Sequence, residues 1–184
     1  MQPVLSRLVV MVTSVLTLTV AACAQLPATA PAPAPAPIVA SAPAPAPAEA
    51  VAKVVYHADF ADPRRFSAML TSINNMVTTY QSDLAEYDVR IVFVAHGIRF
   101  VTADALKGTP FAEDAELKER RKNLTERLRS LHDTQGVKLE LCGITREQVG
   151  LDPEKLIAGV ELVTSGVVRI AELQHRGFAY IKIE

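Results

Sequence analysis

Apolar residues recur with two different periods between residues 51 and 184, and these periods predict alternating strands and helices. The first helix is predicted over residues 62–83, where apolar side chains lie three and four positions apart, the spacing of one buried helix face. Asp62 and Pro63 supply its N-cap and first-turn proline. Short apolar runs, each with the length of a strand, occur at 51–57, 89–95, 137–141, 161–163 and 178–183.

The segments between the later strands predict further helices of unequal strength. A charged stretch over residues 113–135 keeps its leucines on one side, which is typical of a helix with one solvated face. Thr145 and Gln148 fit the capping box of a short helix, and Asp152-Pro153 begins another turn. The other helical segments are a weak one at 98–106 and one at 165–176 that Gly177 ends.

Strands that alternate with helices predict an α/β fold, an open and mostly parallel five-stranded sheet with helices on both faces. The run at 89–95 is almost wholly apolar, as expected for a strand that is covered on both sides. The alternation does not encode the order of the strands, for which the flavodoxin-like order 2-1-3-4-5 is a common choice. In such sheets, ligands bind outside the carboxyl ends of the strands.

Three chemically active side chains follow strand ends and are therefore the candidate site. His57 ends the first strand, His96 ends the second and Cys142 ends the third. In a 2-1-3 order His57 would lie between the other two, with His96 two strand spacings of ~4.8 Å from Cys142. A thiolate is stabilised by a nearby cation or a helix N-terminus, and the helix capped by Thr145 would begin close by. We therefore expect Cys142 to be the nucleophile, with His57 and His96 stabilising the thiolate or moving protons.

Each of these residues also has a structural interpretation. A free cysteine is often a small buried hydrophobe, and a histidine at a strand end is often only a hydrogen-bonded loop residue. The three ligand types together would suit zinc or copper, but the tight spacings of metal motifs are missing. The sequence contains neither a phosphate-binding glycine loop nor a Gly-x-Ser-x-Gly elbow, so no cofactor, nucleotide or hydrolase activity is expected.

The first fifty residues predict export. Residues 1–22 have the weakly positive start, apolar run and small residues of a signal peptide, and the run is shorter than the ~20 residues of a membrane span. Val20-Ala21-Ala22-Cys23 resembles a lipobox, so we expect Cys23 to be lipidated, with Ala24 favouring the outer membrane. Cleavage after Ala24 would instead release a soluble periplasmic protein. Residues 23–50 form an Ala/Pro-rich linker, predicted to be a semi-rigid spacer.

Charge and cysteine content narrow the possible functions. The formal net charge of −1 argues against a nucleic-acid partner, which requires clustered Lys and Arg. The chain has 2 cysteines, and Cys23 belongs to the lipobox, so Cys142 is the only thiol of the predicted domain. An unpaired thiol in an oxidising compartment calls for a functional explanation.

Five stretches of the chain, spread over about residues 53–183, resemble the DsrE/DsrF-like family. They are Lys53 to His57, Asn74-Asn75, Val94 to Gly97, Cys142 to Thr145, and the C-terminal run from Ser165-Gly-Val-Val to Gly177-Phe-Ala-Tyr-Ile-Lys182. The resemblance implies a DsrE-like α/β subunit that assembles into homo-oligomers. It also implies a cysteine, here Cys142, that holds persulfide sulfur and hands it to a partner thiol.

These lines together predict a sulfur-handling protein in the periplasm that carries persulfide or sulfane sulfur on Cys142. Its expected partners are a sulfur donor or acceptor protein or a small thiol, and it would contact the membrane only through the lipid on Cys23. The alternative is a non-catalytic oligomeric binding or assembly module of the cell envelope, in which Cys142 is merely buried.

Overall fold

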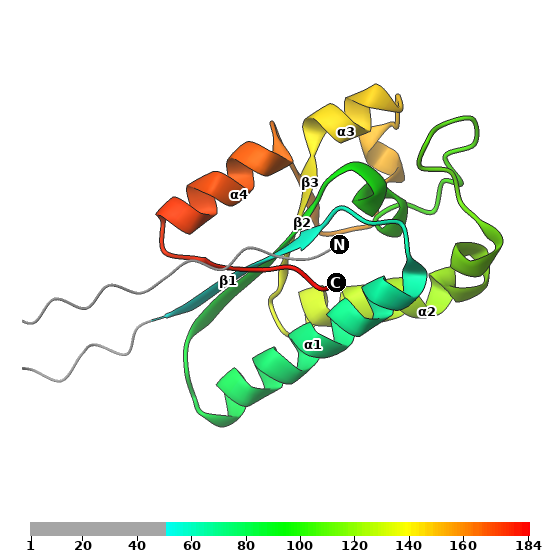
Figure 1. Cartoon of the computed structure of the whole chain (residues 1–184). Helices are drawn as coiled ribbons and strands as arrows, with labels where there is room; N and C mark the ends of the chain where they lie inside the picture. Colours follow the sequence, from blue (N-terminus) through cyan, green and yellow to red (C-terminus); the bar gives the residue numbers. More distant parts are fainter. Residues whose placement is uncertain (1–50) are drawn as a thin grey trace, which may run out of the picture. The chain divides into compact units, whose positions relative to one another are not determined.

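The computed structural model describes residues 51–184, which form one sheet with its helices (Figure 1). The predicted signal peptide (1–22) and linker (23–50) lie outside the described residues. Within residues 51–184, no helix is both long enough and apolar enough to span a bilayer. The strands are β1 (Ala52–Ala58), β2 (Tyr87–Phe93), β3 (Lys138–Cys142), β4 (Val160–Val163) and β5 (Ala179–Ile181). The helices are α1 (Pro63–Ser82), η1 (Ala95–Phe100), α2 (Ala115–Asp133), α3 (Gly143–Gln148), η2 (Pro153–Lys155) and α4 (Gly166–His175).

All strand pairs of the sheet are parallel, which confirms the predicted fold class, and the order is β4-β3-β2-β1-β5. This order differs from the flavodoxin-like 2-1-3-4-5 order that was considered as a common choice. The first four strands follow one another side by side, as sequential strands usually do. Only α4 returns across the sheet, to place β5 beside β1. The change matters for the site because β2 lies between β1 and β3, so the neighbour of β3 on this side is β2 and not β1.

The two faces of the sheet are covered unequally. Helices α1 and α2 lie together on one face and α4 lies on the other (Figure 1). The α1/α2 face holds the large apolar core, to which β1 contributes Val54, Tyr56 and Ala58. Under α4 lies a small cluster made of Val55, Val92, Ile170, Leu173 and Phe178. One helix is too narrow to cover five strands, which leaves room on this face for charged side chains.

Two local predictions are corrected at the carboxyl ends of β2 and β3. The short helix α3 begins at Gly143 with Cys142 in the N-cap position, and not with Thr145 as the cap. Thr145 is not the cap because it is the third residue of α3, and its hydroxyl accepts a hydrogen bond from the N–H of Ala95 at 3.0 Å. The weak helical segment expected at 98–106 is η1, which starts earlier, directly after β2.

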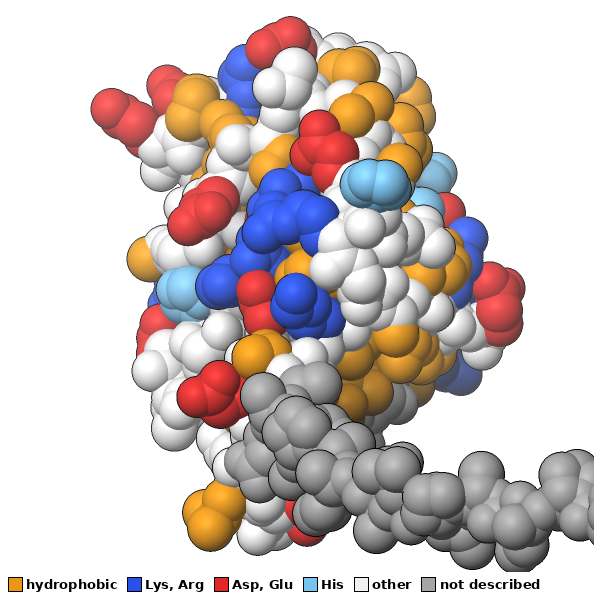
Figure 2. Space-filling view, turned by 90° about the vertical axis from the view of Figure 1, so that its left-hand side faces the viewer, with side chains coloured by type: hydrophobic (Ala, Val, Ile, Leu, Met, Phe, Trp, Pro, Cys, Tyr) orange, Lys and Arg blue, Asp and Glu red, His pale blue; other side chains and the backbone are white. Residues whose placement is uncertain are grey.

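A buried ion network occupies the α4 face of the sheet. The Glu140 side chain on β3 is only 1% exposed, and it accepts hydrogen bonds from Arg90 on β2 at 2.8 Å and from Arg169 on α4 at 2.7 and 2.8 Å. Arg90 also donates to both carboxylate oxygens of Asp88. Lysine and arginine side chains lie beside aspartate and glutamate on the face of the molecule shown in Figure 2. A buried carboxylate of this kind is stable only while its basic partners remain in place.

Protonation of Glu140 should make folding depend on pH. Burial raises the pKa of this carboxyl group, but hydrogen bonds and charges from Arg169 and Arg90 lower it by more. The pKa of Glu140 is therefore below its usual value. A lowered pKa in the folded state means that the network stabilises the protein above the unfolded-state pKa and loses this effect as the pH falls. Urea unfolding between about pH 6 and pH 3 should show a steeper loss of stability in the parent protein than in Glu140→Gln. Equal pH slopes in the two proteins would contradict this prediction.

Candidate functional site

Cys142 lies at the carboxyl end of β3, between the beginnings of α3 and α4, and is 4% exposed. The first residue of α4, Gly166, packs directly on it. A Cβ atom added to Gly166 would lie 3.0 Å from Cβ of Cys142 and 2.6 Å from Cγ2 of Val94. Only glycine therefore lets the backbone of α4 come this close to the end of β3.

Hydrogen bonds to the sulfur favour the thiolate. Burial raises the pKa of the Cys142 thiol, but the backbone N–H of Gly166 and both the N–H and hydroxyl of Thr145 lower it. The N–H of Ile144 acts in the same direction, and the net shift is downward. A thiolate is the nucleophilic form of cysteine. The backbone at the two helix starts can therefore stabilise the sulfur without a neighbouring cation.

The hydroxyl of Thr145 is held in place from the end of β2. Thr145 is 5% exposed and accepts the N–H of Ala95, so its own proton is free to point elsewhere. Ala95 adopts a φ of +48°, a left-handed conformation that costs a non-glycine residue about 1–2 kcal/mol. This backbone turn connects β2 to the surroundings of the thiol.

His57 is not brought into contact with Cys142. Its register partner on β2 is Val92, whose partner on β3 is Glu140, so His57 lies two strands from β3 and in line with Glu140. Its Nδ1 is 3.0 Å from the hydroxyl of Tyr180, and its Nε2 is buried without a hydrogen-bond partner. Burial lowers the pKa of His57, against the opposing charge of Asp59. The imidazole is therefore mostly neutral at pH 7 and is a poor source of positive charge for a thiolate.

His96 lies in η1, one residue after Ala95, and its ring packs edge-on against Phe111 with centroids 5.0 Å apart. Its Nδ1 is buried without a hydrogen-bond partner. Phe111 belongs to the large core on the α1/α2 side of the sheet. The contacts of His96 therefore lead away from the α4 face on which Cys142 lies.

These placements bear on the metal alternative. In the part of the chain that the structure describes, no three or more His, Cys, Asp or Glu side chains form a group able to hold a metal ion. His57, His96 and Cys142 thus do not form a ligand set in this arrangement.

Glu140 and Arg169 were not singled out from the sequence, and Gly166 was named only within the Ser165-Gly-Val-Val motif, without a role at the thiol. One signal for them was present: Lys138 and Glu140 alternate with apolar residues in the third strand run, which indicates a strand with one polar face. Nothing local in the sequence pairs Glu140 with Arg169, because the two residues meet only through the packing of α4 on the sheet.

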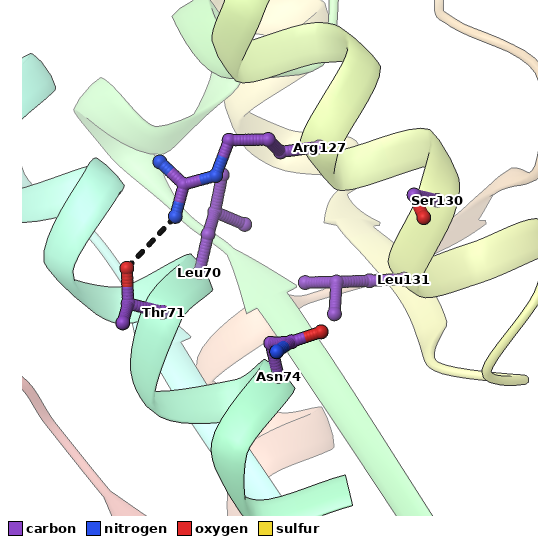
Figure 3. A pocket seen from close by; sticks show the side chains of 6 residues that line it. All are labelled: Leu70, Thr71, Asn74, Arg127, Ser130 and Leu131. Carbon is purple, nitrogen blue, oxygen red and sulfur yellow. Dashed lines mark hydrogen bonds between the residues drawn. The ribbon is translucent and has the colours of Figure 1, made fainter. Parts of the chain in front are cut away.

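Surface hollows occur both near the thiol and far from it. The hollow in Figure 3 lies between α1 and α2, where Arg127 donates to the hydroxyls of Thr71 and Ser67. It contains no cysteine or histidine and is on the face opposite α4. Two other hollows border the connection from β4 to α4, beside Cys142, and share Leu162, Val163 and Thr164. Neither of these two hollows is lined by Cys142 itself, which is buried.

Comparisons with known proteins identify the family of the chain and support its fold. The sequence profile of the DsrE/DsrF-like family matches residues 50–183. Among solved structures, the protein of unknown function MTH1491 from Methanobacterium thermoautotrophicum is similar, with 26% identity, a TM-score of 0.54, and coverage of 71% of this chain and 98% of that chain. The ychN protein from E. coli has 20% identity and a TM-score of 0.48, with coverage of 72% and 99%. No curated protein matches the sequence.

Proposed function

Because the chain belongs to the DsrE/DsrF-like family, which suggests a function of the sulfur-relay type, we propose that it carries persulfide or sulfane sulfur on Cys142. The observation that carries this proposal is the position of Cys142, at the N-cap of α3 and in close contact with Gly166 at the start of α4. The backbone of α3 and α4 lowers the pKa of a thiol that is the only cysteine among the described residues. Such a thiolate is ready to attack a sulfane sulfur.

The sulfur-loading step needs no oxidant. The thiolate of Cys142 attacks the terminal sulfur of a donor persulfide, R–S–SH, and forms a new S–S bond to it. The S–S bond of the donor breaks, and the donor leaves as the thiolate R–S⁻ with the electron pair of that bond. Attack by an acceptor thiolate on the outer sulfur of the Cys142 persulfide reverses these roles and restores the Cys142 thiolate.

The proposed setting is the periplasm, with the protein held at the outer membrane by a lipid on Cys23. Support comes from the signal-peptide pattern of residues 1–22 and from the lipobox that ends at Cys23; a soluble periplasmic protein is the alternative. The proposed partners are a sulfur donor or acceptor protein, or a small thiol, and further copies of this chain. In this proposal, His57 and His96 are proton-moving groups at most, because His57 lies two strands from β3 and the ring of His96 packs on Phe111.

A second function, a non-catalytic assembly module, is favoured by a different observation. Cys142 is only 4% exposed, whereas four apolar side chains on the neighbouring elements α3, β4 and α4 are exposed to solvent. They are Ile144 (58%), Leu162 (43%), Val167 (60%) and Val168 (54%). A surface of this kind suits a protein contact. In this second function, Cys142 would be only a packed core residue beneath that surface.

Labelling of the thiol separates the two functions. In a protein that begins at residue 24, Cys142 is the only thiol, so uptake of iodoacetamide reports on it alone. The sulfur-carrier proposal predicts that the folded protein is alkylated at pH 7 and is labelled more slowly after denaturation, where the backbone hydrogen bonds are lost. The assembly module predicts the reverse, with negligible labelling until denaturant exposes the side chain. The reverse result would overturn the sulfur-carrier proposal.

A further inference from the structure

A single ion pair joins the start of α4 to the strand that carries the thiol. Arg169 is in the first turn of α4, where its N–H donates to the carbonyl of Ser165 at 2.9 Å. Its Nε and Nη2 donate to the two carboxylate oxygens of Glu140 at 2.7 and 2.8 Å. Glu140 precedes Cys142 by two residues in β3, so both side chains point to the α4 face of the sheet.

Glu140 is itself fixed from the other side, which makes it a firm anchor for α4. Its Oε1 also accepts Nη1 of Arg90 at 2.8 Å, and Arg90 is bound to both carboxylate oxygens of Asp88. The guanidinium of Arg90 also lies over the ring of Phe178, 5.3 Å from its centroid. Because the Glu140 side chain is almost completely buried, it has no solvated position to which it could move when α4 shifts.

The contact that this anchor holds is the one between Gly166 and Cys142. A Cβ atom added to Gly166 would lie only 3.0 Å from Cβ of Cys142, so the two residues are in close contact. Hydrogen bonds to an ionised acceptor are sensitive to distance and direction. A small displacement of the first turn of α4 would therefore weaken the hydrogen bond from the N–H of Gly166 to the sulfur.

We propose that Arg169 and Glu140 are positioning residues for Cys142, which hold the N-terminus of α4 so that the N–H of Gly166 donates to its sulfur. The inference rests on the proposed function of Cys142 as a reactive thiol. Neither residue is a nucleophile or a proton donor in the sulfur exchange. Their effect passes through the backbone of α4.

The test is the pH profile of Cys142 alkylation in the protein that begins at residue 24. Arg169→Met removes the guanidinium and keeps an unbranched side chain. We expect the rate at pH 7 to fall by about tenfold, with the inflection of the profile moved to higher pH. Arg169→Lys, which can still reach one carboxylate oxygen, should recover part of the rate. The matched control is Arg121→Met, because Arg121 forms a partly buried pair with Glu113 at 2.7 Å on the other side of the molecule.

Two further variants keep the proposal testable if Arg169→Met unfolds. Glu140→Met/Arg169→Met removes both charges of the pair, and Gly166→Ala pushes α4 away from Cys142 by adding a methyl group. Both should move the inflection in the same direction as Arg169→Met. The Asp, Glu, Lys, Arg and His side chains on β2, β3, β4, α3 and α4 are Asp88, Arg90, Lys138, Glu140, Arg146, Glu147, Glu161, Arg169, Glu172 and His175. Of these, only Glu140 and Arg169 change in these variants.

The possible outcomes separate the inference from the function on which it rests. If the folded parent is alkylated but the folded variants keep its pH profile, the positioning roles are wrong and the sulfur-carrier proposal stands. If the folded parent is not alkylated at all, both fail. If Arg121→Met moves the profile as far as Arg169→Met, a general loss of stability explains the shift and the positioning roles are again wrong.

Discussion

Replacing Cys142 with alanine is expected to abolish the transfer of sulfur by this protein. A donor persulfide and an acceptor thiol exchange sulfur slowly on their own, and the parent protein should accelerate this exchange. Within residues 51–184 there is no second cysteine to take over, and alanine cannot form an S–S bond. The acceptor persulfide, measured over time by mass spectrometry, should therefore appear at the protein-free rate.

Two control variants test whether the loss of transfer is due to the sulfur atom of Cys142. Cys142→Ser keeps the size and hydrogen-bonding capacity of the side chain but lacks the sulfur, and it should be as inactive as Cys142→Ala. Arg121→Met removes a side chain on the other side of the molecule, which pairs with Glu113 and has no role in the exchange, so it should retain acceleration by the protein. If Cys142→Ala transferred sulfur at the parent rate, the thiol would have no part in the exchange.

Gly97→Ala is expected to cost about 3 kcal/mol or more of folding stability, the largest single-methyl effect in the domain. The added Cβ would lie 2.0 Å from the carbonyl oxygen of Ala58 and 3.0 Å from its carbon. That oxygen accepts the N–H of Val94 at 2.9 Å, so it cannot withdraw without breaking a hydrogen bond between β1 and the end of β2. Urea unfolding measures the loss directly.

Gly136→Ala is the matched control for Gly97→Ala. Gly136 has a φ of +67° and nothing within 4 Å of its Cβ position, so alanine there suffers only the backbone penalty of about 1–2 kcal/mol. Gly97→Ala should be clearly more destabilising, because close backbone contact and not φ is its cause. Equal losses in the two variants would show that the space around Gly97 opens easily.

The sequence predicted those parts of the fold that local patterns encode. Apolar periodicity located α1 to within one residue at each end, and Asp62 caps it as expected, accepting the N–H groups of Arg64 and Arg65. The strand runs and the parallel α/β class followed from the same alternation. These features depend on neighbours in sequence, so a single chain is enough to reveal them.

The parts that failed depend on contacts between distant segments. The order of the strands depends on how the helices pack on the two faces of the sheet. No local pattern of residues encodes this packing. The capping box at Thr145 was misleading because α3 already begins at Gly143, directly after β3, and the hydroxyl of Thr145 accepts the N–H of Ala95 from the end of another strand. The pairing of Glu140 with Arg169 could not be foreseen for the same reason.

The expected meeting of His57 with the thiol depended on the order of the strands. With β2 between β1 and β3, Val92 lies between His57 and the strand of Cys142. The chemistry around the sulfur is instead supplied by backbone N–H groups and one hydroxyl. Backbone N–H groups are present whatever the residue type, so the sequence does not reveal which of them lie near the sulfur. The sequence patterns therefore pointed to the imidazoles instead.

Intact-mass measurement of the single-thiol protein after exposure to a sulfane-sulfur donor tests the central claim most directly. The protein begins at residue 24, is incubated with polysulfide, freed of the donor under native conditions and weighed beside its Cys142→Ala variant. We predict that the parent gains the mass of one or more sulfur atoms, loses it again on treatment with a thiol reductant, and that the variant gains none. An unchanged parent mass, or an equal gain in the variant, would contradict a role of Cys142 as the sulfur carrier.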